Sequence, residues 1–310
     1  MSIKLKSLSL SSLTTFILSV SSILLLGCNP EKPLILATYT YSTNDRIENM
    51  RPLSEALKVD LNRQVLLKSF PDVASFIAGI KSNEVDIALI NTLGYLQLAL
   101  DNQHMIAVAN LKIRENALDN YKTVLLTNQD TLDVQNLNEY ASQLSMMFVA
   151  EGSTSGNLVP RLFLSSIGIS EPQSQFLNAS YGGNHTSTFE KLLNGETDLC
   201  AIGSNEYFKQ IDQDSTLAEK VKLLWTSEEI PLGPLLLNKQ LSQSEQERIT
   251  NLLMGLHESN SKTLESLKAG WSEAKQADQF QLITDSYYDS FREVNGNRTD
   301  LYKILDSFGK

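Results

Sequence analysis

The stretch SMMFVAEGSTSGNLVPRLFL (residues 145–164) contains the pattern that decides the fold. Its first five residues form an apolar run of the length of a buried strand. Two glycines then bracket a polar turn, and apolar residues at helical spacing follow. A strand, a tight turn and a helix in succession are the repeating unit of α/β proteins. Such a turn presents backbone N–H groups at the N-terminus of a helix, a position that favours anions.

Similar strand and helix patterns alternate along the rest of the chain. Asp72 and the pair Ser242 and Glu245 stand where helix caps are expected. The alternation predicts an α/β protein with largely parallel sheets, built as two lobes with a helical C-terminal segment. The strand candidates are residues 34–37, 64–67, 85–90, 105–110, 124–127, 145–149, 176–177, 198–202 and 221–225, with helices at 46–58, 72–80, 158–164, 185–193 and 242–256.

The composition excludes several classes of protein. The chain has 310 residues, of which 42% are hydrophobic, which is enough for two lobes of about 100–150 residues each. Its formal net charge of −10 offers no positive field for nucleic acid. Two cysteines exclude a disulfide scaffold. His, Cys and carboxylate residues do not cluster at metal-ligand spacing, so we expect neither a metal nor another cofactor.

Residues 1–27 have the features of an export signal. Lys4 and Lys6 precede an apolar stretch that serines and threonines interrupt. The stretch ends in Leu25-Leu26-Gly27-Cys28, which resembles the lipobox of bacterial lipoproteins, whose cysteine is acylated and becomes the mature N-terminus. We therefore expect an exported chain, lipid-anchored through Cys28 and a tether at 28–33, that faces the periplasm or the cell exterior. The alternative is an ordinary signal peptide with a chance cysteine. The other thiol, Cys200, lies in an apolar run and is expected to be a buried small hydrophobe.

Three hydroxyl residues in the central turn are candidate anion ligands. Ser153, Thr154 and Ser155 supply neutral donors, and Gly156 lets a ligand approach the backbone. The alternative is that a hydroxyl of this turn merely caps the helix. The turn lacks the lysine of a phosphate-binding P-loop. Pro160 lies early in the predicted helix and is expected to distort its first turn.

His185, Tyr41, Thr92 and Tyr95 are further candidates. His185 opens a helix after two glycines, which lets it face a cleft, although a lone histidine is more often structural. The other three follow predicted strands, and the carboxyl ends of strands are where open α/β sheets bind ligands. Packing alone would also explain the tyrosines. A serine hydrolase using Ser155 and His185 lacks the expected nucleophile elbow.

Five segments of the chain resemble the phosphate, phosphite and phosphonate substrate-binding proteins of bacterial ABC transporters. The resemblance as a whole is spread over roughly residues 34–290, and the order and spacing of the five segments are more specific than any one of them. The segments are STSGNLVP (153–160), NEVDIA (83–88), YKTVLL (121–126), GNH (183–185) followed by NGETD (194–198), and IP (230–231) with Pro234.

The resemblance implies a two-lobed type II periplasmic-binding-protein fold with two crossovers. Residues 34–126 with 231–310 would form one lobe, and residues 127–230 the other. Ser153, Thr154, Ser155 and Gly156 would hold a small phosphorus oxyanion together with His185. Tyr95, Tyr41 and Thr92 would approach it from the other lobe. The protein would not be an enzyme, and its closed form would dock on a membrane permease.

Departures from the family pattern leave the ligand open. Asn205 and Gly233 stand where aminophosphonate-binding members carry acids, which argues against 2-aminoethylphosphonate unless Glu206 substitutes. Glu151 would disfavour a doubly charged ligand if it faced the site. Two other functions remain: a sensor or accessory binding protein of the same fold for a different small ligand, and an exported serine hydrolase.

Overall fold

The computed structural model describes residues 31–41, 46–115, 117, 120–294 and 298–308. The expected signal sequence, Cys28 and the rest of the tether up to residue 30 lie outside these residues. Residues 34–310 form one compact unit, which contains two sheets. Of the helices in the described part of the chain, none is both long and apolar enough to cross a membrane.

The first sheet has six strands in the order β11-β4-β10-β3-β1-β2. β1 pairs in parallel with β2 and β3, whereas β10 and β11 run antiparallel to their neighbours. The strands are β1 (Leu34–Tyr39), β2 (Val65–Phe70), β3 (Ile87–Leu89), β4 (Met105–Ile113), β10 (Pro234–Asn238) and β11 (Ala277–Leu282).

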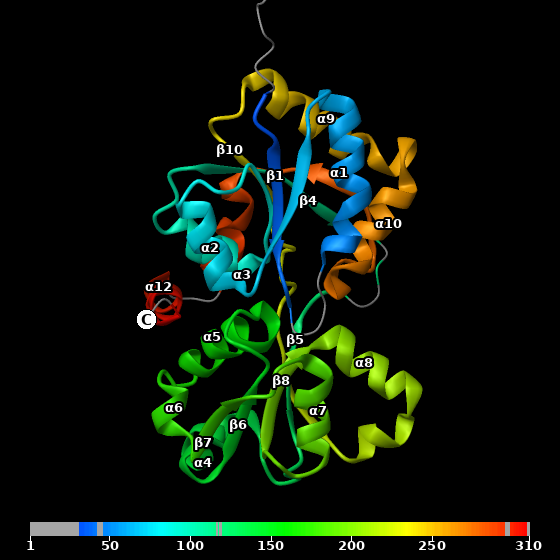
Figure 1. The fold of residues 1–310 in the computed structure, drawn as a ribbon. Helices are drawn as coiled ribbons and strands as arrows, with labels where there is room; N and C mark the ends of the chain where they lie inside the picture. Colours follow the sequence, from blue (N-terminus) through cyan, green and yellow to red (C-terminus); the bar gives the residue numbers. More distant parts are fainter. Residues whose placement is uncertain (1–30, 42–45, 116, 118–119, 295–297, 309–310) are drawn as a thin grey trace, which may run out of the picture. The chain divides into compact units, whose positions relative to one another are not determined.

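Helices cover both faces of this sheet (Figure 1). Alternate residues of β1 point to opposite faces, so Leu34 and Leu36 join one apolar cluster while Ala37 and Tyr39 join the other. The first cluster includes residues of α1, α9 and α10, and the second includes residues of α2 and α3. The helices are α1 (Ile47–Leu61), α2 (Val73–Lys81), α3 (Thr92–Ala99), α9 (Gln243–Ser259), α10 (Ser261–Ala269), α11 (Asp289–Val294) and α12 (Arg298–Ser307), with short 3₁₀ turns at Ser272–Ala274 and Asp285–Tyr288.

The second sheet has five strands in the order β7-β6-β8-β5-β9. β6 pairs in parallel with β7 and β8, and β5 runs antiparallel to β8 and β9. Its strands are β5 (Thr123–Thr127), β6 (Ser145–Phe148), β7 (Asn178–Tyr181), β8 (Leu199–Gly203) and β9 (Lys222–Thr226). Its helices are α4 (Val134–Tyr140), α5 (Val159–Ser166), α6 (Pro172–Gln175), α7 (His185–Leu193) and α8 (Ser204–Gln213), with 3₁₀ turns at Ala141–Gln143 and Ser215–Glu219 and a π-helical turn at Thr154–Leu158.

The sheets are mixed rather than largely parallel, because β5 and β10 each enter a sheet against the direction of its parallel strands. The expected lobe boundary at residue 127 falls at the end of β5, which is hydrogen-bonded within the second sheet. Because β5 pairs with strands of the second sheet, the pairing places the start of the second lobe at Thr123.

The local sequence signals hold in detail. The Asp72 carboxylate caps α2 by accepting a hydrogen bond from the Ser75 amide at 2.7 Å. Ser242 and Glu245 form a capping box at the start of α9. Cys200 is fully buried in β8.

The C-terminal helix α12 contacts both lobes. It packs against α3 of the first lobe and α5 of the second. Leu301 and Leu305 are 1% exposed and belong to the same apolar cluster as Leu96 of α3 and Leu162 of α5. This cluster is therefore continuous across the two lobes.

Gly233, in the return crossover, has no room for a side chain. A Cβ atom there would overlap the carbonyl oxygen of Ile90 and lie 2.6 Å from the Cα of Asn91. These are backbone atoms that cannot move aside without displacing the end of β3. An acidic residue at position 233 is thus sterically excluded in this arrangement.

We predict that Gly233→Ala lowers the free energy of unfolding by about 1–3 kcal/mol, because the methyl group overpacks the crossover. Gly255→Ala is the matched control, since its Cβ would meet Ser259 Oγ at 3.8 Å within helix α9. Alanine there should be neutral or stabilising. Urea denaturation of both variants tests the prediction, and equal midpoints for the two would contradict it.

Candidate functional site

A cavity of about 110 Å³ is lined by residues from both lobes. The first lobe contributes the end of β1, the N-cap residue of α3, and the segment around the end of α10, whereas the second contributes the starts of the π-helical turn, α7 and α8. The lining residues are Tyr39, Tyr41, Arg46, Asn91, Tyr121, Ser153, Thr154, His185, Asn205, Ala269, Gly270, Ser272 and Glu273.

The turn that begins at Ser153 is a π-helical turn rather than an α-helical one. The Leu158 amide donates to the carbonyl of Ser153, five residues back, at 3.1 Å. Pro160 follows within the first two positions of α5, so the expected distortion of the first turn is present. The Ser153 hydroxyl accepts a hydrogen bond from the Gly156 amide at 3.0 Å. Ser153 therefore caps the helix and lines the cavity at the same time.

The other two hydroxyls of the turn differ in their surroundings. Thr154 Oγ1 accepts a hydrogen bond at 3.0 Å from the amide of Leu93, which lies in the opposite lobe. Ser155 is fully buried, and its hydroxyl has no hydrogen-bond partner. Ser155 is not itself among the lining residues, but its Oγ and the His185 ring lie 3.3 and 3.5 Å from where a Cβ on Gly203 would stand. Because Gly203 has no side chain, the space between the Ser155 hydroxyl and the His185 ring stays open.

His185 is held in one neutral form. Its Nδ1 accepts a hydrogen bond from the Gly203 amide at 2.9 Å, so the proton of the neutral ring is on Nε2. Burial lowers the pKa of His185 to about 4, although Glu206 acts in the opposite direction. At neutral pH the side chain is therefore an uncharged N–H donor on the cavity wall.

Three more buried polar groups on the wall have unpaired atoms. The hydroxyls of Tyr39 and Tyr41 and the Nη1 of Arg46 have no hydrogen-bond partner. Burial raises the pKa of both tyrosines, so their hydroxyls stay protonated and able to donate. Buried donors without partners are rare in folded proteins, because each costs about 1–3 kcal/mol. Their convergence on one cavity indicates a binding site for a group rich in acceptors.

The two lobes are in direct contact at the edge of this cavity. Asn91 Nδ2 donates to the carbonyl of Gly152 in the second lobe at 2.8 Å, while its Oδ1 accepts from the Gly94 amide at 2.9 Å and caps α3. Together with the bond between Leu93 and Thr154, this contact ties the start of α3 to the turn before α5.

Two of the expected ligand residues lie elsewhere. The Tyr95 hydroxyl donates to Asp285 Oδ1 at 2.5 Å, and its ring lies 4.8 Å from that of Tyr288. Thr92 donates to the carbonyl of Pro231 at 2.5 Å. Neither residue lines the cavity, and Gly156 does not line it either. The structure does bring together Tyr41, Ser153, Thr154 and His185.

The acidic residues considered from the sequence are not on the cavity wall. Glu151 is exposed, and Glu206 Oε1 accepts hydrogen bonds from Thr186 and Gln210. The carboxylate that does line the cavity is Glu273, which the sequence did not indicate, and the same holds for Arg46. No motif connects these two residues, because they are more than 200 residues apart in the sequence and meet only through the fold.

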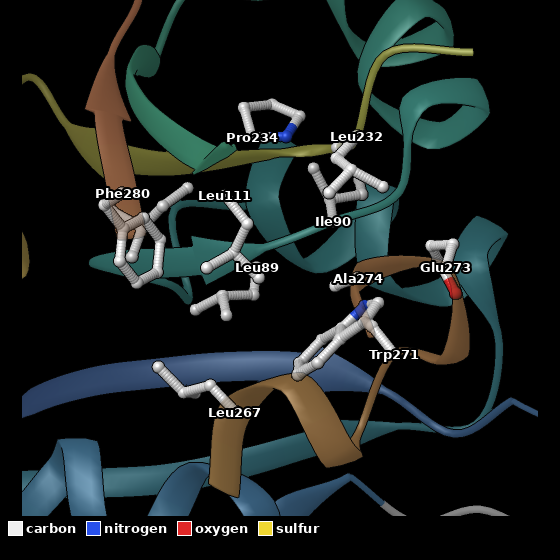
Figure 2. Close-up of a pocket in the computed structure, with 12 residues that line it drawn as sticks. Leu89, Ile90, Leu111, Leu232, Pro234, Leu267, Trp271, Glu273, Ala274 and Phe280 are labelled. Carbon is white, nitrogen blue, oxygen red and sulfur yellow. The ribbon is translucent and has the colours of Figure 1, made fainter. Parts of the chain in front are cut away.

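Two other hollows have a different character. A small apolar cavity beside the site is lined by leucines, Phe280 and the Trp271 indole, with Glu273 at its edge (Figure 2). A larger groove of about 810 Å³ runs along the return crossover and α5. The buried unpaired atoms of the described residues do not line this groove. Within the described part of the chain there is also no cluster of His, Cys and carboxylate residues that could hold a metal.

The neutral state of His185 gives the protein an acid-sensitive stability. The unfolded chain takes up a proton below a pKa near 6.5, whereas the folded ring does so only near 4. Stability therefore falls as the pH drops from about 6.5 to 4, by up to about 3 kcal/mol. His185→Asn, which keeps an acceptor for the Gly203 amide, should show a flatter profile over this range. Denaturant titrations at pH 7.5, 5.5 and 4.0 would contradict this assignment if both proteins lost the same stability.

Comparisons with known proteins identify the family of the chain. Residues 36–288 match the family model described as the phosphonate, periplasmic substrate-binding protein of ABC transporters. The chain is 24% identical to the phosphonates-binding periplasmic protein of Escherichia coli K12 over 261 residues, which are 82% of this chain and 75% of the relative.

Solved structures show the same fold. A binding-protein component of a Pseudomonas aeruginosa ABC phosphonate transporter has a TM-score of 0.63 and 19% identity, covering 90% of this chain and 96% of that one. A Prochlorococcus marinus protein solved in complex with methylphosphonate has a TM-score of 0.65 and 18% identity, covering 86% and 97%. The type II periplasmic-binding-protein fold implied by the sequence is thus confirmed. The chain belongs to the family of periplasmic phosphonate substrate-binding proteins of ABC transporters.

Proposed function

We propose that this chain is the substrate-binding lipoprotein of an importer that captures a small phosphorus oxyanion between its lobes and delivers it to a membrane permease. The observation that carries the proposal is the convergence of unpaired, buried donors from Tyr39, Tyr41 and Arg46 on one cavity, with the Nε2–H of His185 on its wall. A phosphonate, phosphite or phosphate group offers several acceptor oxygens to such donors.

The charge of the groups proposed to hold the anion determines how binding depends on lobe closure. Most of the donors are neutral, and hydrogen bonds from neutral donors to an anion are strong only where water is excluded. The contacts of Asn91 and Thr154 across the lobes lie at the edge of the cavity, and lobes closed in this way would limit the access of water to the ligand. Separation of the lobes would break these contacts and rehydrate the ligand. Binding and release are thereby coupled to lobe closure, as an importer requires.

A sensor or accessory protein of the same fold remains the second candidate, and the neighbouring genes distinguish it from a transport protein. The hydrolase hypothesis is weakened by the state of His185. Its Nδ1 accepts the Gly203 amide and its Nε2 carries the proton, so the neutral ring has no free acceptor for the hydroxyl proton of Ser155. The family match to binding proteins also favours binding over turnover.

The ligand is tested by calorimetric titration of the mature chain from residue 29, freed of ligand by unfolding and refolding. The panel is phosphate, phosphite, methylphosphonate, 2-aminoethylphosphonate and sulfate. We expect saturable binding of a phosphorus oxyanion in preference to sulfate. If the folded protein binds none of these anions, the proposed ligand class is overturned.

Ser155→Ala should change affinity and stability in opposite directions. The Ser155 hydroxyl is buried without a partner, so its removal should leave the free protein as stable or more stable. The loss of a donor to the bound oxyanion should weaken binding by about 1–3 kcal/mol. Ser54→Ala is the control, because Ser54 is equally buried but donates to the carbonyl of Val65 at 3.2 Å. That variant should lose stability and keep its affinity; unchanged affinity in Ser155→Ala would remove this hydroxyl from the site.

The proposed anchor depends on one thiol. Cys28→Ser should leave the lobes folded, as judged by the same melting temperature, and should release the protein from the membrane fraction. Fractionation of cells expressing both forms measures this. If the variant stays in the membrane fraction, the leader is an uncleaved anchor and not a lipoprotein signal.

A further inference from the structure

Arg46 is a buried cation in the binding cavity. Its side chain is 4% exposed, and its guanidinium carbon lies 4.8, 5.4 and 4.7 Å from the ring centroids of Tyr39, Tyr41 and Trp271. Nε donates to the carbonyl of Gly270 at 2.9 Å, which fixes the plane of the group. Nη1 has no partner. A buried charge of this kind is expensive unless something pairs with it.

Glu273 brings the opposite charge to the same cavity. It lies on the 3₁₀ turn after Trp271 and is partly exposed. It forms no salt bridge with Arg46, although both line the cavity. Burial alone would lower the pKa of Arg46, but Tyr39 and Glu273 outweigh it, and the guanidinium remains charged. The two charges face the cavity without neutralising each other by contact.

The other lining residues carry no charge at neutral pH. They are protonated tyrosines, hydroxyl and amide side chains, small residues, and His185 in its neutral form. Among the described residues that line the cavity, Arg46 is therefore the one cation and Glu273 the one anion. Of these residues, Arg46 offers a ligand anion a full charge–charge attraction, and Glu273 repels it.

We propose that Arg46 forms the ionic contact with the anionic group of the ligand and that Glu273 limits the net charge the cavity accepts. The cavity then selects a small oxyanion with one net negative charge. This inference deepens the proposed function and rests on the same site.

The experiment measures the affinity of the mature chain and four variants for methylphosphonate, at pH values below and above its second ionisation. Arg46→Met should weaken binding by about 10- to 100-fold, as expected for a charge-assisted hydrogen bond in a closed site. Arg46→Lys keeps the charge without the planar group and should recover part of this loss. Arg63→Met is the matched control, because Arg63 pairs with Glu245 away from the cavity.

Glu273→Gln should change the affinity in the opposite direction to Arg46→Met. It should tighten binding of the doubly charged form at the higher pH by about threefold or more, and should have little effect at the lower pH. A merely structural role for either residue would instead lower the melting temperature without this dependence on ligand charge. An affinity of Arg46→Met within about threefold of wild type, or weaker binding of the doubly charged ligand by Glu273→Gln, would overturn the inference.

The outcome also separates this inference from the proposed function. If the wild-type chain binds sulfate, which is doubly charged, but no phosphorus oxyanion, the proposed ligand class and the charge limit assigned to Glu273 are both overturned, and the same variants measured with sulfate decide the role of Arg46. If the wild-type chain binds none of these anions, both proposals fail.

Discussion

Buried hydrogen-bond donors need acceptors, and several donors in this protein have none among the protein's own groups. The hydroxyls of Tyr39 and Tyr41, the Nη1 of Arg46 and the hydroxyl of Ser155 are all buried without partners. Such groups weaken a fold, since each has lost its water and gained nothing in exchange. They are tolerated because two apolar cores, one on each face of the six-stranded sheet, hold the surrounding elements in place. A bound anion would accept hydrogen bonds from these groups together, so that ligand binding would also stabilise the fold.

The second feature is that the lobes meet through a few directional contacts beside this cavity and through an apolar cluster farther away. Asn91 and Thr154 supply the hydrogen bonds across the cavity edge. The apolar contact comes from α12, whose Leu301 and Leu305 pack with residues of α3 and α5. Hydrogen bonds between lobes are exchanged easily for water, whereas exposing buried leucines opposes opening. The C-terminal helix, which lies beyond the region matched by the family model, therefore adds buried apolar contact between the lobes.

The sequence predicted those parts of the site that local rules determine. Ser153 to Pro160 follow a strand and open a helix, and Asn184 and His185 open another, so periodicity and capping signals place them at element ends. Tyr95 shows the limit of such rules, because a strand-end position does not say where a ring points, and Asp285 and Arg292 hold its hydroxyl outside the cavity. Arg46 and Glu273 could not be found from sequence, since their proximity arises from the return of the chain to the first lobe after β9. The mixed sheets have the same origin, in the reversed direction of β5 and β10.

Neutral donors and a nearly balanced pair of charges suit a protein that must release what it binds. A cavity with a large surplus of positive charge would attract an anion even with the lobes apart, because charge interactions extend over several ångströms. Neutral hydrogen bonds lose most of their value once water enters, so affinity falls steeply on opening. With His185 kept uncharged by burial and Glu273 opposite in charge to Arg46, the attraction proposed for the anion would be concentrated in the closed state. On the proposed function, the groups that bind the anion tightly between closed lobes would therefore hold it only weakly when the lobes separate.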